Sequence, residues 1–232
     1  MNIKFILQNN LYDPVCRAWM RNVCSMRSYQ SEALRTVYDA AMNGKGGRFT
    51  ITFPRQSGKN ETQAQLESAL MAANQFQGGS IIKIIPTEKN QGAVSRDRLE
   101  TILMGGSRKT GKRNGSRKNI IRYGSTQVRC LSASPNAAIV GATADLLLEV
   151  DEAQLVPAEK FDREAAPMAA SANAVRVFWG TVWDDRTLLA RESRLAARDG
   201  ETDGRKHMFL TDARSEERRV GKECRSRWSP YH

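Results

Sequence analysis

A glycine–lysine turn is the segment of this sequence best suited to bind phosphate groups. It covers residues 53–60 (F-P-R-Q-S-G-K-N), between a β-rich run and a helical stretch. Glycine lets backbone N–H groups approach phosphate oxygens, and lysine supplies a positive point charge. The first turn of the following helix adds unpaired N–H groups and a positive dipole end. The turn is therefore predicted to bind the phosphates of a nucleotide, through Gln56, Ser57, Gly58, Lys59 and Asn60.

An acidic pair at the end of a second apolar run is suited to metal binding and to acid–base chemistry. Asp151 and Glu152 directly follow the run at 146–150. One carboxylate at such a strand end typically organises Mg²⁺, and a second one polarises an attacking water. Neighbouring residues of an extended chain point to opposite sides, but a turn can aim both into one cleft. We expect Asp151 to hold Mg²⁺ and Glu152 to act as general base; the alternative is a solvated pair at a helix start.

Two positions depart from the usual P-loop pattern G-x-x-x-x-G-K-[ST]. Phe53 stands in place of the first glycine, and Asn60 stands in place of the Ser or Thr that ligates Mg²⁺. An amide oxygen can coordinate a hard cation, but it neither ionises nor donates as a hydroxyl does. Asn60 is therefore a candidate metal ligand, and it also leaves open a nucleotide-binding module that does not hydrolyse its ligand.

Strands and helices alternate around these two motifs. β-rich runs predict strands at 48–53, 80–85, 146–150 and 174–182, and a hairpin of two short strands within 119–133. Apolar spacing predicts helices at 60–75 and 88–104. This alternation predicts an α/β fold of the P-loop NTPase type, with a mainly parallel central sheet flanked by helices on both faces. The helix positions expected to be buried are Leu66, Leu70, Met71, Val94, Leu99, Ile102 and Leu103.

Two further short motifs lie outside the turn and the acidic pair. Tyr29-Gln30 lies upstream of the turn, and Trp179-Gly180-Thr181 ends a later strand. Together with R-Q-S-G-K-N at 55–60 and D-E-A-Q at 151–154, they resemble the motifs of the ATPase domain of phage terminase large subunits, in order and in spacing. The same tyrosine–glutamine and D-E-A-x elements also occur in helicases and DNA-repair ATPases, which remain an alternative.

The resemblance implies a role for each of these residues, with ATP and Mg²⁺ as cofactors. Tyr29 would stack on the adenine and Gln30 would bond its edge. Arg55 would contact the γ-phosphate or signal to a neighbouring subunit, and Thr181 would couple hydrolysis to movement. Taken singly, Tyr29 and Gln30 could lie on an ordinary helix face, and Trp179 could be a core aromatic residue.

The resemblance also implies partners. Terminases translocate double-stranded DNA into a preformed capsid as a homo-oligomeric ring on the portal protein, and a small terminase subunit recognises the viral DNA. The chain carries 36 Lys and Arg against 25 Asp and Glu, a formal charge of +11, which suits a phosphate-rich partner. Six basic residues without an acid fall within 107–118, so this segment either contacts DNA or a neighbouring subunit or is a solvated loop.

The composition changes at Arg214. Segment 214–232 lacks helical or strand periodicity, and it looks like the conceptual translation of a common sequencing adapter. We therefore expect an ATPase domain at 1–213, truncated before a nuclease domain, and a non-native tail at 214–232. No signal peptide or membrane-spanning run is evident, which predicts a cytoplasmic protein. The spacing of the four cysteines matches no zinc site, so free thiols are expected.

Overall fold

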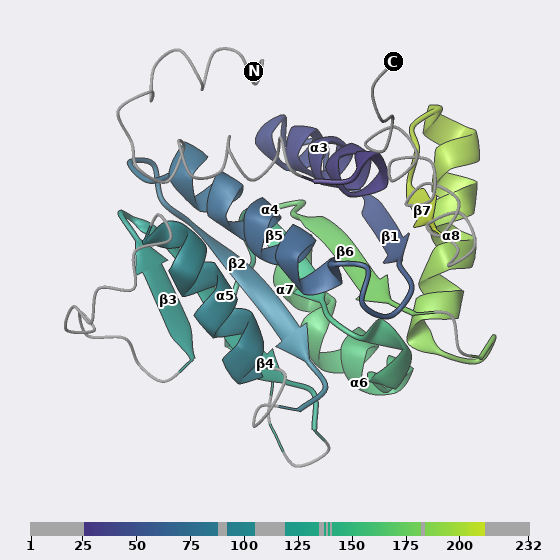
Figure 1. The fold of residues 1–232 in the computed structure, drawn as a ribbon. Coiled ribbons are helices and arrows are strands. Elements are labelled where there is room, and N and C mark those ends of the chain that lie inside the picture. Colours follow the sequence, from purple (N-terminus) through teal and green to yellow (C-terminus); the bar gives the residue numbers. More distant parts are fainter. Residues whose placement is uncertain are drawn as a thin grey trace, which may run out of the picture.

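The computed structural model describes residues 26–87, 92–104, 119–134, 137, 139, 141–181 and 184–211. Within them the chain forms a seven-stranded sheet in the order β3-β4-β2-β5-β6-β1-β7 (Figure 1). All neighbouring strands are parallel except β3 and β4, which form an antiparallel hairpin. The strands are β1 (Arg48–Thr52), β2 (Gly79–Ile85), β3 (Ile120–Tyr123), β4 (Thr126–Ser132), β5 (Leu147–Val150), β6 (Val175–Gly180) and β7 (Met208–Leu210).

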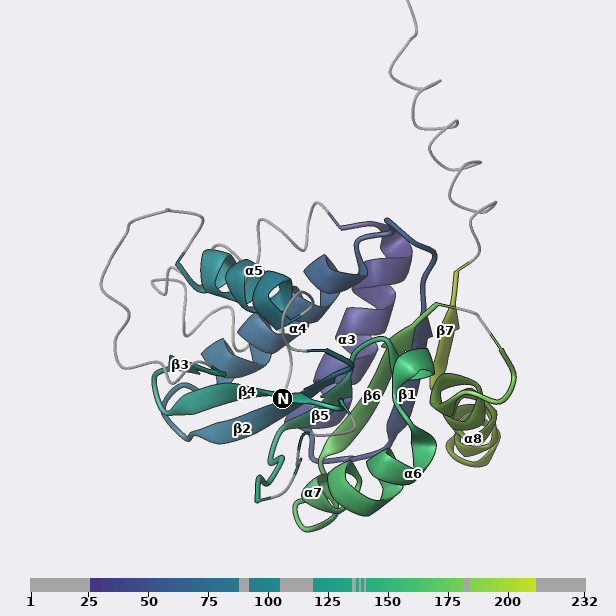
Figure 2. The same cartoon turned by 90° about the horizontal axis from the view of Figure 1, so that it is seen from below.

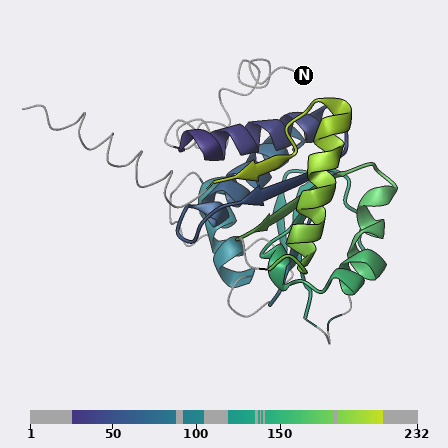
Figure 3. The ribbon, with the colours of Figure 1, turned by 90° about the vertical axis from the view of Figure 1, so that its right-hand side faces the viewer.

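Helices cover both faces of the sheet. Figure 2 shows α3, α4 and α5 on one face and α6, α7 and α8 on the other. Figure 3 shows α8 crossing in front of β1, with which it makes extensive contact. Parallel strands connected by helices are expected to be buried in this way. The helices are α3 (Ser28–Met42), α4 (Lys59–Ala73), α5 (Ala93–Leu103), α6 (Ala158–Lys160), α7 (Pro167–Ala170) and α8 (Leu188–Asp203), with short 3-10 and π-helical turns at Ala153–Leu155 and Phe161–Ala165.

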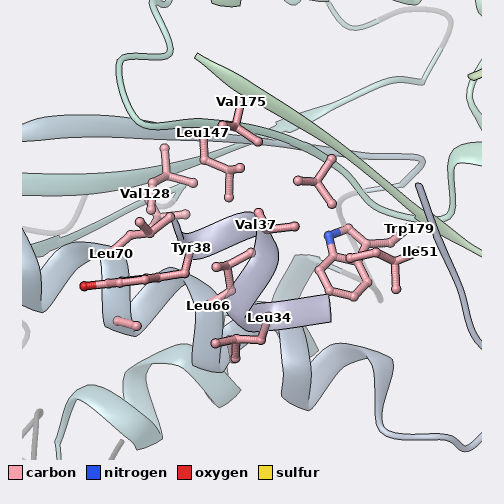
Figure 4. Close-up of a cluster of buried hydrophobic side chains, with 14 of the residues drawn as sticks. Leu34, Val37, Tyr38, Ile51, Leu66, Leu70, Val128, Leu147, Val175 and Trp179 are labelled. Atoms are coloured by element: carbon pink, nitrogen blue, oxygen red, sulfur yellow. The ribbon is translucent and has the colours of Figure 1, made fainter. Parts of the chain in front are cut away.

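The central strands send alternate side chains into two hydrophobic clusters, one on each face. Ile81 and Ile85 of β2 face the cluster under α3 and α4, whereas Ile82 and Ile84 face the cluster under α6, α7 and α8. Figure 4 shows part of the first cluster, where Leu34 and Val37 of α3 and Leu66 and Leu70 of α4 pack towards the sheet. Burial on both faces explains why these strands read as nearly continuous apolar runs.

Helix α4 is buried along most of its length although its sequence is polar. Every residue from Thr62 to Ala72 is buried, including Gln63, Gln65 and Glu67. Because a buried polar group is costly unless it is hydrogen-bonded, these side chains need partners inside the protein. The helix therefore brings a set of polar contacts, as well as its N-terminal lysine, to the centre of the fold.

The predicted fold class is confirmed, and the predicted elements are observed with shifts of a few residues at their ends. Leu66, Leu70, Met71, Leu99 and Ile102 are buried as expected. The expectation for Val94 is wrong, since this side chain is 50% exposed. The buried residues of α5 are Ser95, Leu99 and Ile102, and Val94 lies off that stripe. Helices α3 and α8 and strand β7 were not predicted.

Several expectations lie outside the described residues. These are the basic segment 107–118, the first four residues of the helix predicted at 88–104, the segment 214–232, and Cys16, Cys24 and Cys224. The remaining cysteine, Cys130, is a buried free thiol on β4, and burial raises its pKa to about 12. Among the helices of the described residues, none is both long and apolar enough to cross a bilayer.

Candidate active site

The glycine–lysine turn at residues 53–60 and the acidic pair lie at the same edge of the sheet. Strand β6 lies between β1, which leads into the turn, and β5, which ends at Val150, directly before Asp151. Because the three strands are parallel, their carboxyl ends meet at one edge. The N–H of Phe53 donates to the carbonyl of Gly180 at 3.2 Å, and the Thr181 hydroxyl donates to the Phe53 carbonyl at 3.4 Å. These two hydrogen bonds tie the end of β6 to the start of the glycine–lysine turn.

The turn is held from beneath by the first residues of α3. The Tyr29 hydroxyl donates to the Ser57 carbonyl at 3.0 Å, and Gln30 Nε2 donates to the same oxygen at 2.8 Å. The Tyr29 ring also packs edge-on against Phe53, with 4.8 Å between ring centroids. Tyr29 and Gln30 therefore contact the backbone of the turn, and they are not among the residues that line the cleft above it.

Gly58 is the N-cap of α4 and adopts a left-handed conformation, with φ at 80°. This places Lys59 in the first helical position, where its side chain reaches across the cleft. An alanine at position 58 would put its Cβ 2.4 Å from Gln30 Nε2. The backbone conformation therefore favours glycine at this position, and an added Cβ would also move the Gln30 amide.

Lys59 and Glu152 form an ion pair across the cleft, through Lys59 Nζ and Glu152 Oε1. Glu152 has φ at 46°, one of three non-glycine residues with positive φ among those described. This left-handed turn directly after β5 lets the two acids point in different directions: Glu152 towards Lys59, and Asp151 towards α4. Gln56 is another of the three, with φ at 63°. Such strained conformations cluster at functional sites.

Gln154 connects the acidic pair to the end of β6. Its Nε2 donates to Glu152 Oε2 at 2.6 Å, and its Oε1 accepts from the Thr181 N–H at 3.4 Å. Gly180 leaves room for this contact, because a Cβ there would lie 2.3 Å from Gln154 Oε1. A single side chain thus links Glu152 to Thr181. Gln154 was not predicted as a site residue, although its place as the fourth residue of D-E-A-Q was a sequence signal that could have identified it.

Asp151 is almost fully buried, at 3% exposure, and lies beside the cleft without lining it. Its Oδ1 accepts from Gln63 Nε2 at 2.8 Å and from the N–H of Glu152 at 2.9 Å. Within the part of the chain that the structure describes, no hydrogen bond reaches Oδ2. One carboxylate oxygen is therefore fixed by the protein, and the other is available to a cation or to a water.

The cleft has a volume of about 520 Å³. Basic side chains from two helices and the turn face one carboxylate in it, so the cleft suits an anionic ligand that carries a cation. Arg98 of α5 was not predicted as a site residue, because an arginine on a helix reads as part of a solvated face. It is paired with Glu61 at 3.3 Å. The lining residues are Pro54, Arg55, Gln56, Gly58, Lys59, Asn60, Arg98, Glu152 and Thr181.

Most of the predicted site residues are brought together. Arg55, Gln56, Gly58, Lys59, Asn60, Glu152 and Thr181 line the cleft. Ser57 is buried behind it, and its hydroxyl donates to the Pro54 carbonyl at 2.6 Å. Among the described residues, no group of three or more His, Cys, Asp or Glu forms a metal cage. Asp151 and Glu152 are two carboxylates beside the turn, and Mg²⁺ is usually held by one or two carboxylates together with substrate phosphates.

Comparison with solved structures gives the fold a precedent. The chain is similar to the large terminase of bacteriophage HK97, with 18% identity, a TM-score of 0.60, and coverage of 80% of this chain and 38% of that one. It is also similar to the large terminase of a thermophilic bacteriophage in complex with ADP, with 16% identity, a TM-score of 0.57, and coverage of 79% and 44%. The fold is that of phage large terminases.

The chain spans less than half the length of the two terminases. No family model and no curated protein matches the sequence. What this chain shares with the two terminases is the three-dimensional arrangement of the sheet and its helices. The chemistry of the site is argued from the residues described above.

Replacing Gly58 with alanine is expected to destabilise the protein and to weaken nucleotide binding. The left-handed backbone costs a non-glycine residue about 1–2 kcal/mol, and the added Cβ would also displace Gln30 from the Ser57 carbonyl. The matched control is Gly204→Ala, at a left-handed position with φ at 71° and no atom within 4 Å of an added Cβ. Urea unfolding measures the stability of both variants. Equal losses of stability and unchanged nucleotide binding would show that the Gln30 contact is unimportant.

Proposed function

We propose that this chain hydrolyses ATP as the motor domain of a terminase large subunit and so drives double-stranded viral DNA into a capsid. The observation that carries the proposal is the meeting of Lys59 and Glu152 across a cleft of about 520 Å³. A lysine at a helix N-terminus and a carboxylate at a strand end on the same edge of the sheet are suited to phosphoryl transfer to water. The likeness to large terminases supports the same proposal through the fold.

The proposed reaction begins with a triphosphate in the cleft. The N–H groups at the start of α4 and the Lys59 ammonium bind the phosphates. Lys59 breaks its ion pair with Glu152 and binds a phosphate oxygen instead. The Glu152 carboxylate is then free. Glu152 then accepts a proton from a water whose oxygen attacks the γ-phosphorus, and the bond from that phosphorus to the oxygen of ADP breaks. Arg55, exposed at the rim, is proposed to contact the γ-phosphate or a neighbouring subunit.

Asp151 and Asn60 are proposed to hold Mg²⁺ beside the phosphates. The free Oδ2 of Asp151 and the amide oxygen of Asn60 are hard oxygen donors, as Mg²⁺ prefers. Bound there, Mg²⁺ would neutralise charge on the phosphate oxygens. Asn60 replaces a hydroxyl residue at this position, so Mg²⁺-dependent ATP turnover is the measurement that separates a hydrolase from a module that only binds nucleotide.

Tyr29, Gln30 and Thr181 are proposed to link the site to its surroundings. Tyr29 and Gln30 are proposed to bind the adenine, and their bonds to the Ser57 carbonyl would transmit its presence to the turn. Thr181 is proposed to couple hydrolysis to movement, because Gln154 bonds both its N–H and Glu152. A change at Glu152 would then reach the end of β6.

The proposed partners follow from the terminase-like fold and from the charge of the chain. They are double-stranded DNA, a portal protein, a small terminase subunit and further copies of the chain in a ring. The basic segment 107–118 is proposed as a DNA contact, since phosphate contacts of this kind do not depend on sequence.

Replacing Lys59 with methionine is expected to weaken ATP binding by about 10- to 150-fold. Hydrogen bonds to charged groups contribute about 1.5–3 kcal/mol, which sets this range. The measurement is equilibrium binding of a fluorescent ATP analogue to the full chain, followed by Mg²⁺-dependent turnover. Methionine keeps the apolar stem of the side chain, so the comparison isolates the ammonium.

The control for this prediction is Lys45→Met, at an exposed lysine outside the cleft. It makes the same change in net charge and should leave ATP binding unchanged. Equal binding by wild type and Lys59→Met would contradict the phosphate-binding role of the turn. ATP binding by the wild type without any Mg²⁺-dependent turnover would favour a non-catalytic nucleotide-binding module.

A further inference from the structure

A network of buried polar side chains runs from Asp151 into the core between α4, β2 and β5. Each member is at most 3% exposed. Lys83, on β2, lies beside Glu149 of β5 in the strand register, and their side chains approach to 3.6 Å. The Lys83 ammonium also donates to Glu67 Oε1 at 2.8 Å and to Gln63 Oε1 at 3.0 Å. The network members are Gln63, Lys83, Glu67, Glu149 and Asp151.

Lys83 and Asp151 together set which way the Gln63 amide points, because one only donates and the other only accepts. The two ends of a glutamine amide differ only in that one accepts and the other donates, so a neighbouring group decides their placement. An ammonium has only donors, and the Gln63 oxygen must therefore face Lys83. The amide N–H groups then face the opposite way, where Gln63 Nε2 donates to Asp151 Oδ1 at 2.8 Å.

The consequence for Asp151 is a fixed carboxylate. Gln63 Nε2 and the backbone N–H of Glu152 both donate to Oδ1, so rotation of the carboxylate about its Cβ–Cγ bond would break two hydrogen bonds. Oδ2 is left without a donor among the described residues. Groups that orient a metal-holding side chain in this way strengthen metal binding without touching the metal.

We propose that Gln63 is a positioning residue for Asp151 and that Lys83 holds the Gln63 amide in the orientation that leaves Asp151 Oδ2 free for the cation. This inference rests on the proposed function, because it concerns the cation that accompanies the nucleotide. A buried lysine with two carboxylates is a poor means of stabilising a fold, since apolar residues of similar volume often serve as well. Orienting the Gln63 amide is a role that would explain why the buried lysine and its carboxylates are present.

The test measures metal affinity separately from turnover. The full chain is loaded with ADP, and Mn²⁺ binding is followed by electron paramagnetic resonance, with metal-free ADP binding and thermal unfolding measured on the same samples. Gln63→Met removes the donor to Asp151 and should weaken Mn²⁺ binding about 10- to 100-fold, with ADP binding unchanged. Glu67→Gln is the control, because it disturbs the same buried cluster but leaves the Gln63–Asp151 bond in place.

A second variant keeps the test decisive if Gln63→Met does not fold. The double variant Lys83→Met/Glu67→Gln removes the two charges together and leaves Gln63 without the ammonium that orients it. It should lose Mn²⁺ affinity, whereas Glu67→Gln alone should not. Wild-type Mn²⁺ affinity in a folded Gln63→Met or in the double variant overturns the inference, and so does an equal loss in Glu67→Gln. A wild-type chain that binds no ADP overturns the proposed function itself.

Discussion

Glu152→Gln is expected to lower ATP turnover by about 10²- to 10⁴-fold, the range that a positioned general base contributes. An amide accepts no proton from the attacking water, so the chemical step slows. The change also removes the negative charge that pairs with Lys59. Lys59 is then free for the phosphates, and ATP binding should be equal to that of the wild type or tighter. Single-turnover hydrolysis and equilibrium binding of ATP measure the two effects independently.

The control is Glu159→Gln, at an exposed glutamate that follows the acidic strand and does not line the cleft. It should turn over ATP as the wild type does. A Glu152→Gln variant with wild-type turnover would remove Glu152 from the role of general base. Weaker ATP binding by that variant would show that the Lys59–Glu152 pair orders the cleft rather than competing with the phosphates.

The sequence predicted the elements whose signals are local. One signal is a glycine and a lysine after a β-rich run, and the other is two acids after an apolar run. Each is recognisable within about ten residues of sequence. In the parallel sheet, the two motifs meet at one edge. The pairing of Lys59 with Glu152 required only that β1 and β5 belong to the same sheet. The roles assigned to the predicted site residues, Lys59, Asp151 and Glu152 included, remain predictions.

The unpredicted features depend on contacts between distant residues. Helix α8 buries Glu192 in its apolar stripe, where Arg48 and Arg191 pair with it. Arg98 reaches the cleft only because α5 packs beside α4. Lys83 interrupts an apolar strand, and from the sequence alone it would be expected to face solvent. In the fold it is buried, and Glu149 of β5 and Glu67 of α4 are its carboxylate partners.

Removing Lys83 alone is expected to destabilise the fold strongly, because its carboxylate partners would stay buried without a cation. Burial by itself would lower the pKa of Lys83, but the carboxylates of Glu149, Glu67 and Asp151 outweigh it and raise the pKa. Lys83 is thus charged in the folded protein. Lys83→Met would leave the carboxylates without their cation, and breaking a buried pair in this way costs about 3–5 kcal/mol. That is a large share of the roughly 5–15 kcal/mol by which domains are stable.

The loss in Lys83→Met should depend on pH, with a sign that follows from Glu149. Burial raises the pKa of Glu149 and Lys83 partly offsets this, so removal of Lys83 raises the pKa further. A carboxyl group with a raised pKa in the folded state destabilises that state as the pH rises above its ordinary value of 4.5. Urea unfolding should therefore show a deficit that grows as the pH rises above the ordinary carboxyl pKa of 4.5. Lys83→Met/Glu67→Gln should recover part of it, and a deficit that neither varies with pH nor responds to the second change would mean that lost packing, rather than unpaired charge, sets the cost.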